Sequence, residues 1–424
     1  MNKIYTTLIM SIIAITSGYA QLVISGEIRP RSELYNGTNN AKTSSDNRPG
    51  LATQQRSRIT LTYTGTGDTE GLKVVLSPQL VSFWGQMPQA YDLLGDGAPG
   101  APEANFSVFE AYALYKFSDL FSLKFGRQAI SYGDQRWFGA LGWAASGRSH
   151  DAFVGKFSLS ESSNLDVGFT LNQTRHTNDP NVSLQNIRAG NKSLQYIWYD
   201  TKLGESVKLP VMVTNVTNQD LDTAGVFDGT HTHVTTFGTM PTIKLSEQLT
   251  VDASAYYQFS GDDHAASLFA ISATYKSGKT PITIGADIVS GKAVDDTDTK
   301  TKTWLQPFGT NHKFYGLMDF FYVGETRQEG LNDFFVKTAF KTGEKSKLLA
   351  HVHHFIANKD YNSAENGELT KDIGTEIDLI YNLNISKPFN LKLGYSQFFA
   401  SEAFGVIPSD DFNSWTWLQL TAKF

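Results

Sequence analysis

The sequence lacks cysteine, and after its first twenty residues it lacks any run of eighteen uncharged apolar residues. The first absence excludes a disulfide-stapled scaffold, thiolate metal sites and cysteine nucleophiles. The second excludes transmembrane helices, which need about 20 consecutive apolar residues. Segments with helical periodicity are almost absent too, whereas a soluble α/β enzyme of 424 residues would normally show them. The chain has 12% aromatic residues and 36 glycines. The sequence therefore predicts an all-β protein.

The sequence also lacks an excess of basic residues and lacks hydrolase motifs. Its 36 Lys and Arg residues stand against 42 Asp and Glu residues, whereas a nucleic-acid-binding domain needs a basic surface. Neither a Gly-x-Ser-x-Gly nor a His-Glu-x-x-His motif occurs. The neighbours Ser149, His150 and Asp151 cannot form a triad among themselves, because successive strand residues point to opposite faces. We predict a protein that is not an enzyme, needs no cofactor and does not bind nucleic acid.

The first twenty residues have the features of a secretory signal peptide. Lys3 supplies a positive start, residues 4–15 form an apolar segment, and Gly18, Tyr19 and Ala20 fit a small-x-small cleavage site. We predict that residues 1–20 are removed after export and that residues 21–424 form one domain.

Short segments in which apolar and polar residues alternate recur from end to end of this domain. Such a period of two predicts β-strands with two different faces. The predicted strands cover residues 22–34, 55–64, 72–82, 106–117, 121–130, 149–159, 164–174, 193–201, 207–215, 233–245, 249–259, 266–276, 282–290, 331–341, 347–356, 373–383, 389–399 and 414–424. In an exported chain this pattern predicts an eighteen-stranded antiparallel transmembrane β-barrel. Only a closed sheet leaves no unpaired backbone groups in lipid. The alternative is a pair of soluble β-sandwiches.

The connections between the predicted strands alternate in length. Short ones, such as 118–120, 160–163, 203–206, 246–248 and 342–346, interleave with the long ones 35–54, 83–105, 131–148, 175–192, 291–330 and 357–372. Short periplasmic turns and long extracellular loops are typical of a bacterial outer-membrane barrel. Residues 312–322 look like a further strand, but an even strand count places them in the extracellular loop 291–330, folded into the mouth as a short helix.

The two faces of the predicted strands separate clearly. Glu27, Arg29, Arg31 and Glu33 share one face of the first strand, and this charged face must point inward, because a charge on the lipid face costs about 2–4 kcal/mol at the midplane. We expect β-bulges at Pro30, Pro78, Pro210 and Pro241. We also expect interfacial girdles from the aromatic residues near strand ends: Tyr63, Tyr115, Phe117, Trp198, Tyr257, Tyr275, Tyr395, Trp415 and Trp417.

The candidate site residues are charged side chains predicted to line the pore. They are Arg29, Arg31, Arg56, Arg58, Glu110, Arg127, Asp134, Arg136, Arg148 and Asp151. Arginine presents a planar fork that holds carboxylates and stays charged, and interspersed acids keep an anion from binding too tightly. The structural alternative is that arginine–aspartate pairs brace a loop inside the barrel without contacting solute.

The pieces Gly126-Arg127-Gln128, Tyr132-Gly133-Asp134-Gln135-Arg136 and Gly147-Arg148-Ser149-His150-Asp151 resemble motifs of the alginate export family of outer-membrane β-barrel porins, as does the segment 309–319. The opening strand with Arg29 and Arg31 is similar as well. The resemblance implies an eighteen-stranded, monomeric barrel with an arginine-lined constriction that passes an anionic polyuronate. The net acidic chain departs from the richer basic lumen of that family.

Metal binding is weighed for two histidine pairs and one acidic run. His231 with His233, and His351 with His353, are spaced i, i+2 on one strand face, but zinc needs three or four ligands and no further ligand is evident by spacing. Residues 295–298 offer three aspartates but no Ca²⁺-loop periodicity. No metal site is predicted.

We therefore predict an outer-membrane channel that passes anionic solutes, such as uronate-type oligo- or polysaccharides, through an arginine-lined lumen. Two alternatives stay open: a general porin whose lumen charges are structural braces, and a receptor or adhesion barrel plugged by its outer loops. The predicted partners are the solute and outer-membrane lipid.

Overall fold

The computed structural model describes residues 20–36, 50–85, 105–172, 191–221, 227–261, 263–278, 280–321, 328–405 and 412–424. The predicted signal peptide lies outside these residues, apart from Ala20. In the described part of the chain, no helix is both long enough and apolar enough to cross a membrane.

The described residues form one antiparallel sheet in which each strand pairs with its neighbours in the sequence. In chain order the strands are β1 (Ala20–Asn36), β2 (Gly50–Gly65), β3 (Leu72–Phe83), β4 (Asn105–Lys116), β5 (Phe121–Gln128), β6 (His150–Ser160), β7 (Ser163–Leu171), β8 (Asn191–Leu203), β9 (Val207–Leu221), β10 (Phe227–Thr239), β11 (Thr242–Lys244), β12 (Leu249–Ser260), β13 (His264–Ser277), β14 (Thr280–Val289), β15 (Leu331–Lys341), β16 (Ser346–Asn362), β17 (Leu369–Asn384), β18 (Phe389–Ala400) and β19 (Asn413–Lys423). The short 3₁₀ helices are η1 (Gly67–Thr69), η2 (Asn311–Lys313) and η3 (Glu402–Phe404).

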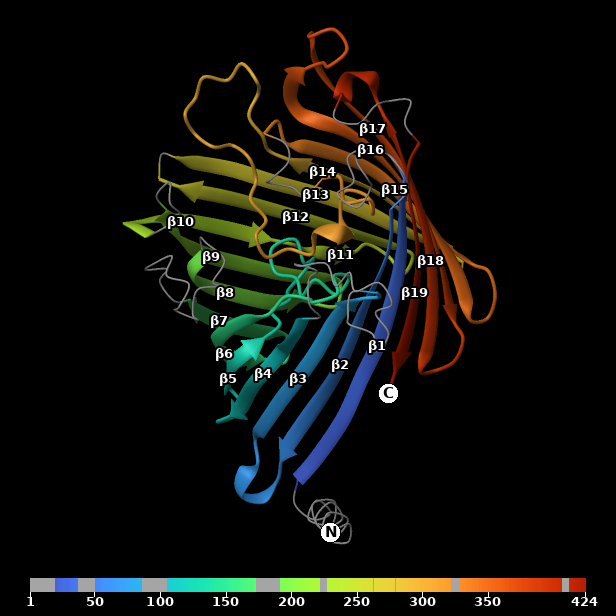
Figure 1. Ribbon diagram of the computed structural model, residues 1–424. Coiled ribbons are helices and arrows are strands. Elements are labelled where there is room, and N and C mark those ends of the chain that lie inside the picture. The colour runs from blue at the N-terminus through green and yellow to red at the C-terminus, as the bar shows by residue number, and fades with distance from the viewer. Residues whose placement is uncertain are drawn as a thin grey trace, which may run out of the picture.

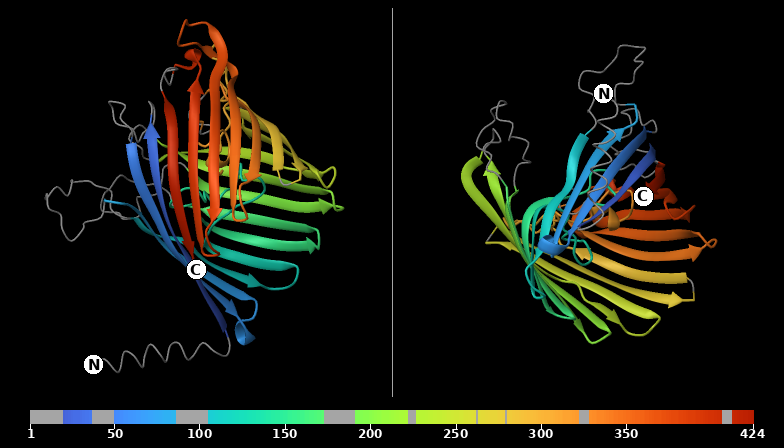
Figure 2. Two further views of the ribbon diagram at one scale, coloured as in Figure 1. Left: turned by 90° about the vertical axis from the view of Figure 1, so that its right-hand side faces the viewer. Right: turned by 90° about the horizontal axis from the view of Figure 1, so that it is seen from below.

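The sheet closes on itself, because β1 pairs with both β2 and β19 (Figures 1 and 2). At the seam, Gly26 and Phe424 exchange two backbone hydrogen bonds of 3.0 and 3.1 Å. β10 and β11 both pair with β9 and β12, so they are two parts of one strand. The structure is thus the predicted eighteen-stranded antiparallel barrel, and closure satisfies the edge groups that a bilayer would leave unpaired.

The connections alternate between the two rims of the barrel, as expected. The short connections 66–71, 117–120, 161–162, 204–206, 245–248, 342–345 and 385–388 share one rim, and the long described connections 129–149 and 290–321 start from the other. The described part of the segment 312–322, residues 312–321, lies in the connection between β14 and β15; it begins within η2 and forms no strand. The even strand count is thus confirmed. The prediction of a long loop at 357–372 is wrong, because β16 and β17 continue into this region and pair there as a hairpin.

The outer and inner faces alternate along each strand. Ile24 and Ile28 of β1 and Ile59 of β2 are exposed on the outside, where they meet lipid, whereas Arg29 and Arg31 are buried inside. This placement confirms the predicted separation of the apolar and charged strand faces. It leaves the interior polar and positions the candidate site there.

Two of the four prolines disturb the ladder. The register of β3 against β4 shifts between Ser77 and Pro78, and the strand formed by β10 and β11 is interrupted at Met240 and Pro241. Pro30 and Pro210 pair in register with Gln55 and Asp200. The expected bulge is therefore found at Pro78, an interruption occurs at Pro241, and the expectation for the other two is wrong.

Candidate functional site: the barrel interior

Two connections enter the lumen, the second after first rising above the rim next to β14 (Figure 1). We call residues 129–149, between β5 and β6, the first inner loop, and residues 290–321, after β14, the second inner loop. They join each other through backbone hydrogen bonds from Gly139 to the Phe308 carbonyl (2.8 Å) and from Thr310 to the Gln135 carbonyl (2.9 Å). Their aromatic side chains Trp137, Phe138, Trp304, Phe308 and Tyr315 belong to the largest buried cluster of the protein.

Four arginines of β1 and β2 point inward and contact the first inner loop. They are Arg29, Arg31, Arg56 and Arg58, and together they donate to the carbonyls of Gly142, Trp143, Ala144, Ala145 and Ser146. The shortest of these bonds, 2.7 Å, joins Arg29 Nη1 to Gly142 O. We call these four side chains the arginine row. The strand period places them together, because each pair is spaced i, i+2 and Arg29 lies opposite Arg56.

The arginine row has fewer carboxylate partners than charges. Arg31 pairs with Glu33 at 3.0 Å, and Arg56 pairs with Glu27. Arg29 and Arg58 form no ion pair within the described residues; Arg58 instead donates to Gln79 Oε1 at 2.6 Å. Carbonyls and an amide oxygen accept hydrogen bonds from Arg29 and Arg58, but neither guanidinium is in direct contact with a carboxylate among the described residues.

Arg136 of the first inner loop is held in a different way. Its Nη2 donates to both carboxylate oxygens of Asp287 at 2.7 Å, its Nη1 donates to Tyr315 at 3.0 Å, and its guanidinium lies over the Phe314 ring. Asp134 caps the Arg136 backbone N–H at 2.9 Å and accepts hydrogen bonds from Ser254 and Tyr256 of β12. Arg136 and Asp134 therefore fasten the loop to the wall.

Arg148 crosses from the first inner loop to the second, where its Nη1 donates to Gly309 O at 2.7 Å. It has no carboxylate partner among the described residues, and burial lowers its pKa to about 10. Glu110 of β4 also faces inward, where it accepts the backbone N–H of Ala129 at 3.1 Å. Both residues lie where the sequence placed them, inside the barrel.

The Arg127–Asp151 pair lies on the other face of the wall. These residues are register partners on β5 and β6, two positions from the stacked outward rings Phe125 and Phe153. They form a bidentate ion pair of 2.8 and 2.9 Å with side chains 45% and 58% exposed. Strand parity thus puts them on the outer wall, and the expectation that they line the pore is corrected.

Three tryptophans expected in the interfacial girdles point inward instead. Trp198 stacks on Tyr132 of the first inner loop, with ring centroids 4.8 Å apart. Trp415 and Trp417 are buried and pack against Trp143. The sequence could have predicted this, because these tryptophans alternate in step with the polar residues of their strands. An aromatic residue on the same strand face as the charged residues must point into the lumen.

A cavity of about 440 Å³ lies in the lumen on the side of the short turns. Its lining includes the cations Lys208, Lys313 and Lys337 as well as Arg136 and Asp333. This mixed lining can hold water and a small charged solute.

The inner wall of β14 to β17 carries acidic residues that the sequence reasoning missed. Asp287, Asp333, Glu376 and Asp378 are all buried. A signal was present, because Asp287 is the only charged residue between Ile282 and Val289. The acidic run at 295–298, by contrast, is paired with Lys302, which contacts Asp296 at 2.8 Å and Asp298 at 3.0 Å.

The fold is similar to that of solved outer-membrane porins. OccAB4 of Acinetobacter baumannii superimposes with a TM-score of 0.59 and 10% identity, covering 95% of this chain and 98% of that one. OpdL of Pseudomonas aeruginosa gives 0.60 and 12%, covering 95% and 99%. OpdK of Pseudomonas aeruginosa gives 0.59 and 11%, covering 95% and 98%. These identities establish the fold alone.

The sequence itself was compared in two further ways. A search of curated proteins finds no significant match. The alginate export family model matches residues 84–414, which is most of the chain. The protein is an outer-membrane β-barrel channel and belongs to the alginate export family.

Proposed function

We propose that this channel passes anionic, carboxylate-bearing solutes, with uronate-type oligo- or polysaccharides as the solute class, and that it works as a monomer. The observation that carries the proposal is the excess of inward guanidinium groups over the carboxylates that pair with them. Arg29 and Arg58, together with Arg148 of the first inner loop, are guanidinium groups without ion-pair partners in the described part of the chain.

These charges act on the lumen although their N–H groups are occupied. A carbonyl dipole solvates a guanidinium but does not cancel its net charge, and protein walls of low dielectric focus the field into the aqueous path. A unit charge about 8 Å from a solute changes its energy by about 1 kcal/mol at an effective dielectric of about 40. That energy corresponds to about a fivefold change in permeability for one charge.

The chemistry of the solute class follows from arginine and from the family. Arginine forks match planar carboxylates, and alginate export is the description of the family. The structure of OpdK, which shares the fold, was determined with vanillate, itself a carboxylate. Arg136 is left out of the proposed filter, because Asp287 neutralises it.

The test is the reversal potential of single channels in planar bilayers under a KCl gradient. We expect chloride preference in the unmodified protein, and about a fivefold loss of it for each charge removed in Arg58→Gln and Arg148→Gln. Arg127→Gln is the matched control, because it removes the same charge from the outer wall. Chloride preference that survives Arg58→Gln combined with Arg148→Gln overturns the proposal. Liposome swelling should also be faster in glucuronate than the size of this solute predicts from neutral sugars.

One observation favours a second candidate, a general porin whose arginines are braces. Each member of the arginine row donates to a carbonyl of the first inner loop. In that case the same variants leave the reversal potential unchanged and increase the current noise, because the loop is released.

A further inference from the structure

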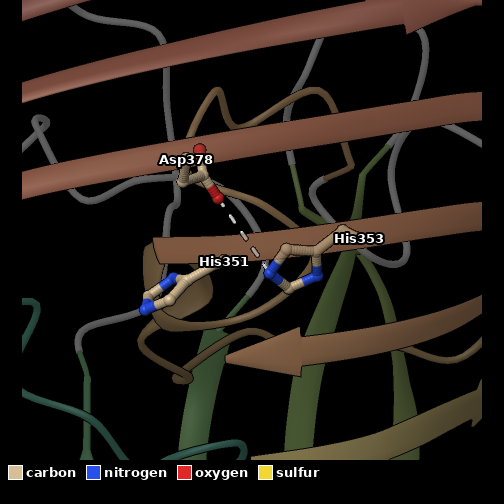
Figure 3. Close-up of side chains that lie close together, drawn as sticks. All are labelled: His351, His353 and Asp378. Atoms are coloured by element: carbon tan, nitrogen blue, oxygen red, sulfur yellow. Dashed lines mark ion pairs between the residues drawn. The ribbon is translucent and has the colours of Figure 1, made fainter. Parts of the chain in front are cut away.

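Two histidines and one aspartate from adjacent strands meet on the inner wall. His351 and His353 lie on β16 and Asp378 lies on β17, with one potential ligand atom of each within 4.8 Å of the others (Figure 3). The sequence shows only the i, i+2 histidine pair. The aspartate comes from the next strand, where the register sets it directly opposite His351.

The tautomer of His353 is set by a neighbouring carboxylate. Its Nδ1 lies 2.9 Å from both oxygens of Asp333 on β15. An Nδ1–H that donates to a carboxylate leaves the lone pair of Nε2 free, and metal-binding histidines are commonly oriented in this way. That Nε2 faces Asp378 Oδ2 at 4.0 Å.

Buried ligand atoms at this place have no hydrogen-bond partner among the described residues. They are Nδ1 of His351 and Oδ2 of Asp378, and Oε2 of the neighbouring Glu376 is unpaired as well. The Glu376 and Asp378 side chains are close enough to share a proton, and Asp378 has no exposed surface. An unsatisfied buried carboxylate oxygen is costly, so its position calls for a bound cation or a proton. Oδ1 of the same side chain is already satisfied by Ser396 at 2.5 Å.

The charge balance around the cluster is negative. Four buried carboxylates, of Asp287, Asp333, Glu376 and Asp378, interact with two cations, Arg136 and Lys337. With neutral histidines these four carboxylates exceed the two cations, and Asp134, 3.4 Å from Arg136, adds further negative charge, so a bound divalent cation lowers the excess. Protons on the Glu376–Asp378 pair are the competing explanation, and Lys337 is the positive group that a bound ion must tolerate.

We propose that His351, His353 and Asp378 form a binding site for a divalent metal ion of the zinc class. Imidazole ligands favour Zn²⁺ and its first-row neighbours over Mg²⁺ and Ca²⁺, which prefer oxygen. Bond lengths of about 2.0–2.2 Å place tetrahedral ligand atoms about 3.4 Å apart. The His353 and Asp378 atoms are 4.0 Å apart and all three ligand atoms lie within 4.8 Å of one another, so metal binding requires the three side chains to close in. Water fills the remaining coordination. The luminal cavity reaches Asp333 and Lys337 and supplies the way in.

The test is isothermal titration of the metal-stripped, folded protein in detergent with ZnCl₂, together with metal analysis after dialysis. We expect one equivalent of Zn²⁺ to bind saturably, and MgCl₂ and CaCl₂ to give no such binding. His353→Gln and Asp378→Asn should each lower the affinity at least tenfold. His354→Gln is the matched control, because His354 is the next residue of the same strand and is exposed on the outer face.

The first outcome needs no variant, and the second needs only a variant that folds. Absence of saturable Zn²⁺ binding by the unmodified barrel overturns the proposal and favours protons as the neutralising charge. Binding that persists in folded His353→Gln also overturns it, because the metal then sits elsewhere. A Co²⁺ titration gives a second readout, since ligation by histidine produces a visible absorption band that should disappear in the same two variants.

Discussion

The guanidinium of Arg31 lies 3.7 Å from the centroid of the Trp143 ring, and its Nη1 donates to the backbone carbonyl of the same residue at 2.8 Å. One side chain of the barrel wall thus holds both the ring and the backbone of the first inner loop. Trp143 also stacks on His312 of the second inner loop, with ring centroids 4.3 Å apart. This tryptophan is therefore the point where the wall and both loops meet.

Replacing Trp143 with alanine should release the first inner loop. The change removes a cation–π contact of about 1–2 kcal/mol and the stacking with His312. We expect trypsin to cut after Arg148, which is largely buried in the unmodified protein, at least several times faster. Limited digestion followed by mass spectrometry measures this rate. Trp84→Ala, which removes an exposed tryptophan, should leave the digestion unchanged, and equal rates for the two variants would contradict the assigned role.

Replacing Asp287 with asparagine should destabilise the barrel strongly. The change removes the bidentate carboxylate partner of the buried Arg136 guanidinium and leaves it only Asp134 at 3.4 Å; breaking a buried pair costs about 3–5 kcal/mol. The free energy of unfolding in guanidinium chloride, measured in detergent, checks this. Asp151→Asn breaks an equally well-formed but exposed pair with Arg127, for which we expect a loss of less than about 1 kcal/mol. Similar losses in the two variants would argue against the bracing role of Arg136.

Replacing Gly168 with alanine should displace Tyr196. On the inner face, the Tyr196 ring covers this glycine so closely that a Cβ would lie 2.0 Å from it. Tyr196 packs in turn against Tyr132 and Phe138 of the first inner loop. Overpacking of this kind costs about 1–3 kcal/mol, measurable as a lower denaturation midpoint. Gly142→Ala, where a Cβ meets open space, is the control and should match the unmodified protein.

The strand count, the inward face and the position of the extracellular loops could all be predicted from the sequence. Local period and connection length determine them, and neither needs tertiary information. The interruption at Pro241 did not mislead the count, because residues 233–245 keep one alternating pattern. The error at 357–372 arose because a hairpin that extends beyond the membrane has no apolar face. Its mostly polar residues lack the alternation that predicts a strand.

The candidate site was predictable in part. Arg29, Arg31, Arg56 and Arg58 were found because charge repeats on one strand face. Arg127 and Asp151 were placed on the wrong face because the Gly-Arg-Gln and Arg-x-x-Asp motifs were taken as one cluster. Alternation along the strand puts them on the same outer face as Phe125 and Phe153, two residues away. The approach of Asp378 to His353 depends on the register between strands, which no single-strand pattern contains.

The seam between β1 and β19 joins the first and last strands of the sequence. Closure must therefore wait until β19 and Phe424 have been synthesised and exported, since the Gly26–Phe424 bonds cannot form earlier. Until then, two strand edges stay open to other chains and invite aggregation. Late truncations that remove Phe424 and its neighbours are thus expected to impair assembly more than deletions of equal length in an extracellular connection.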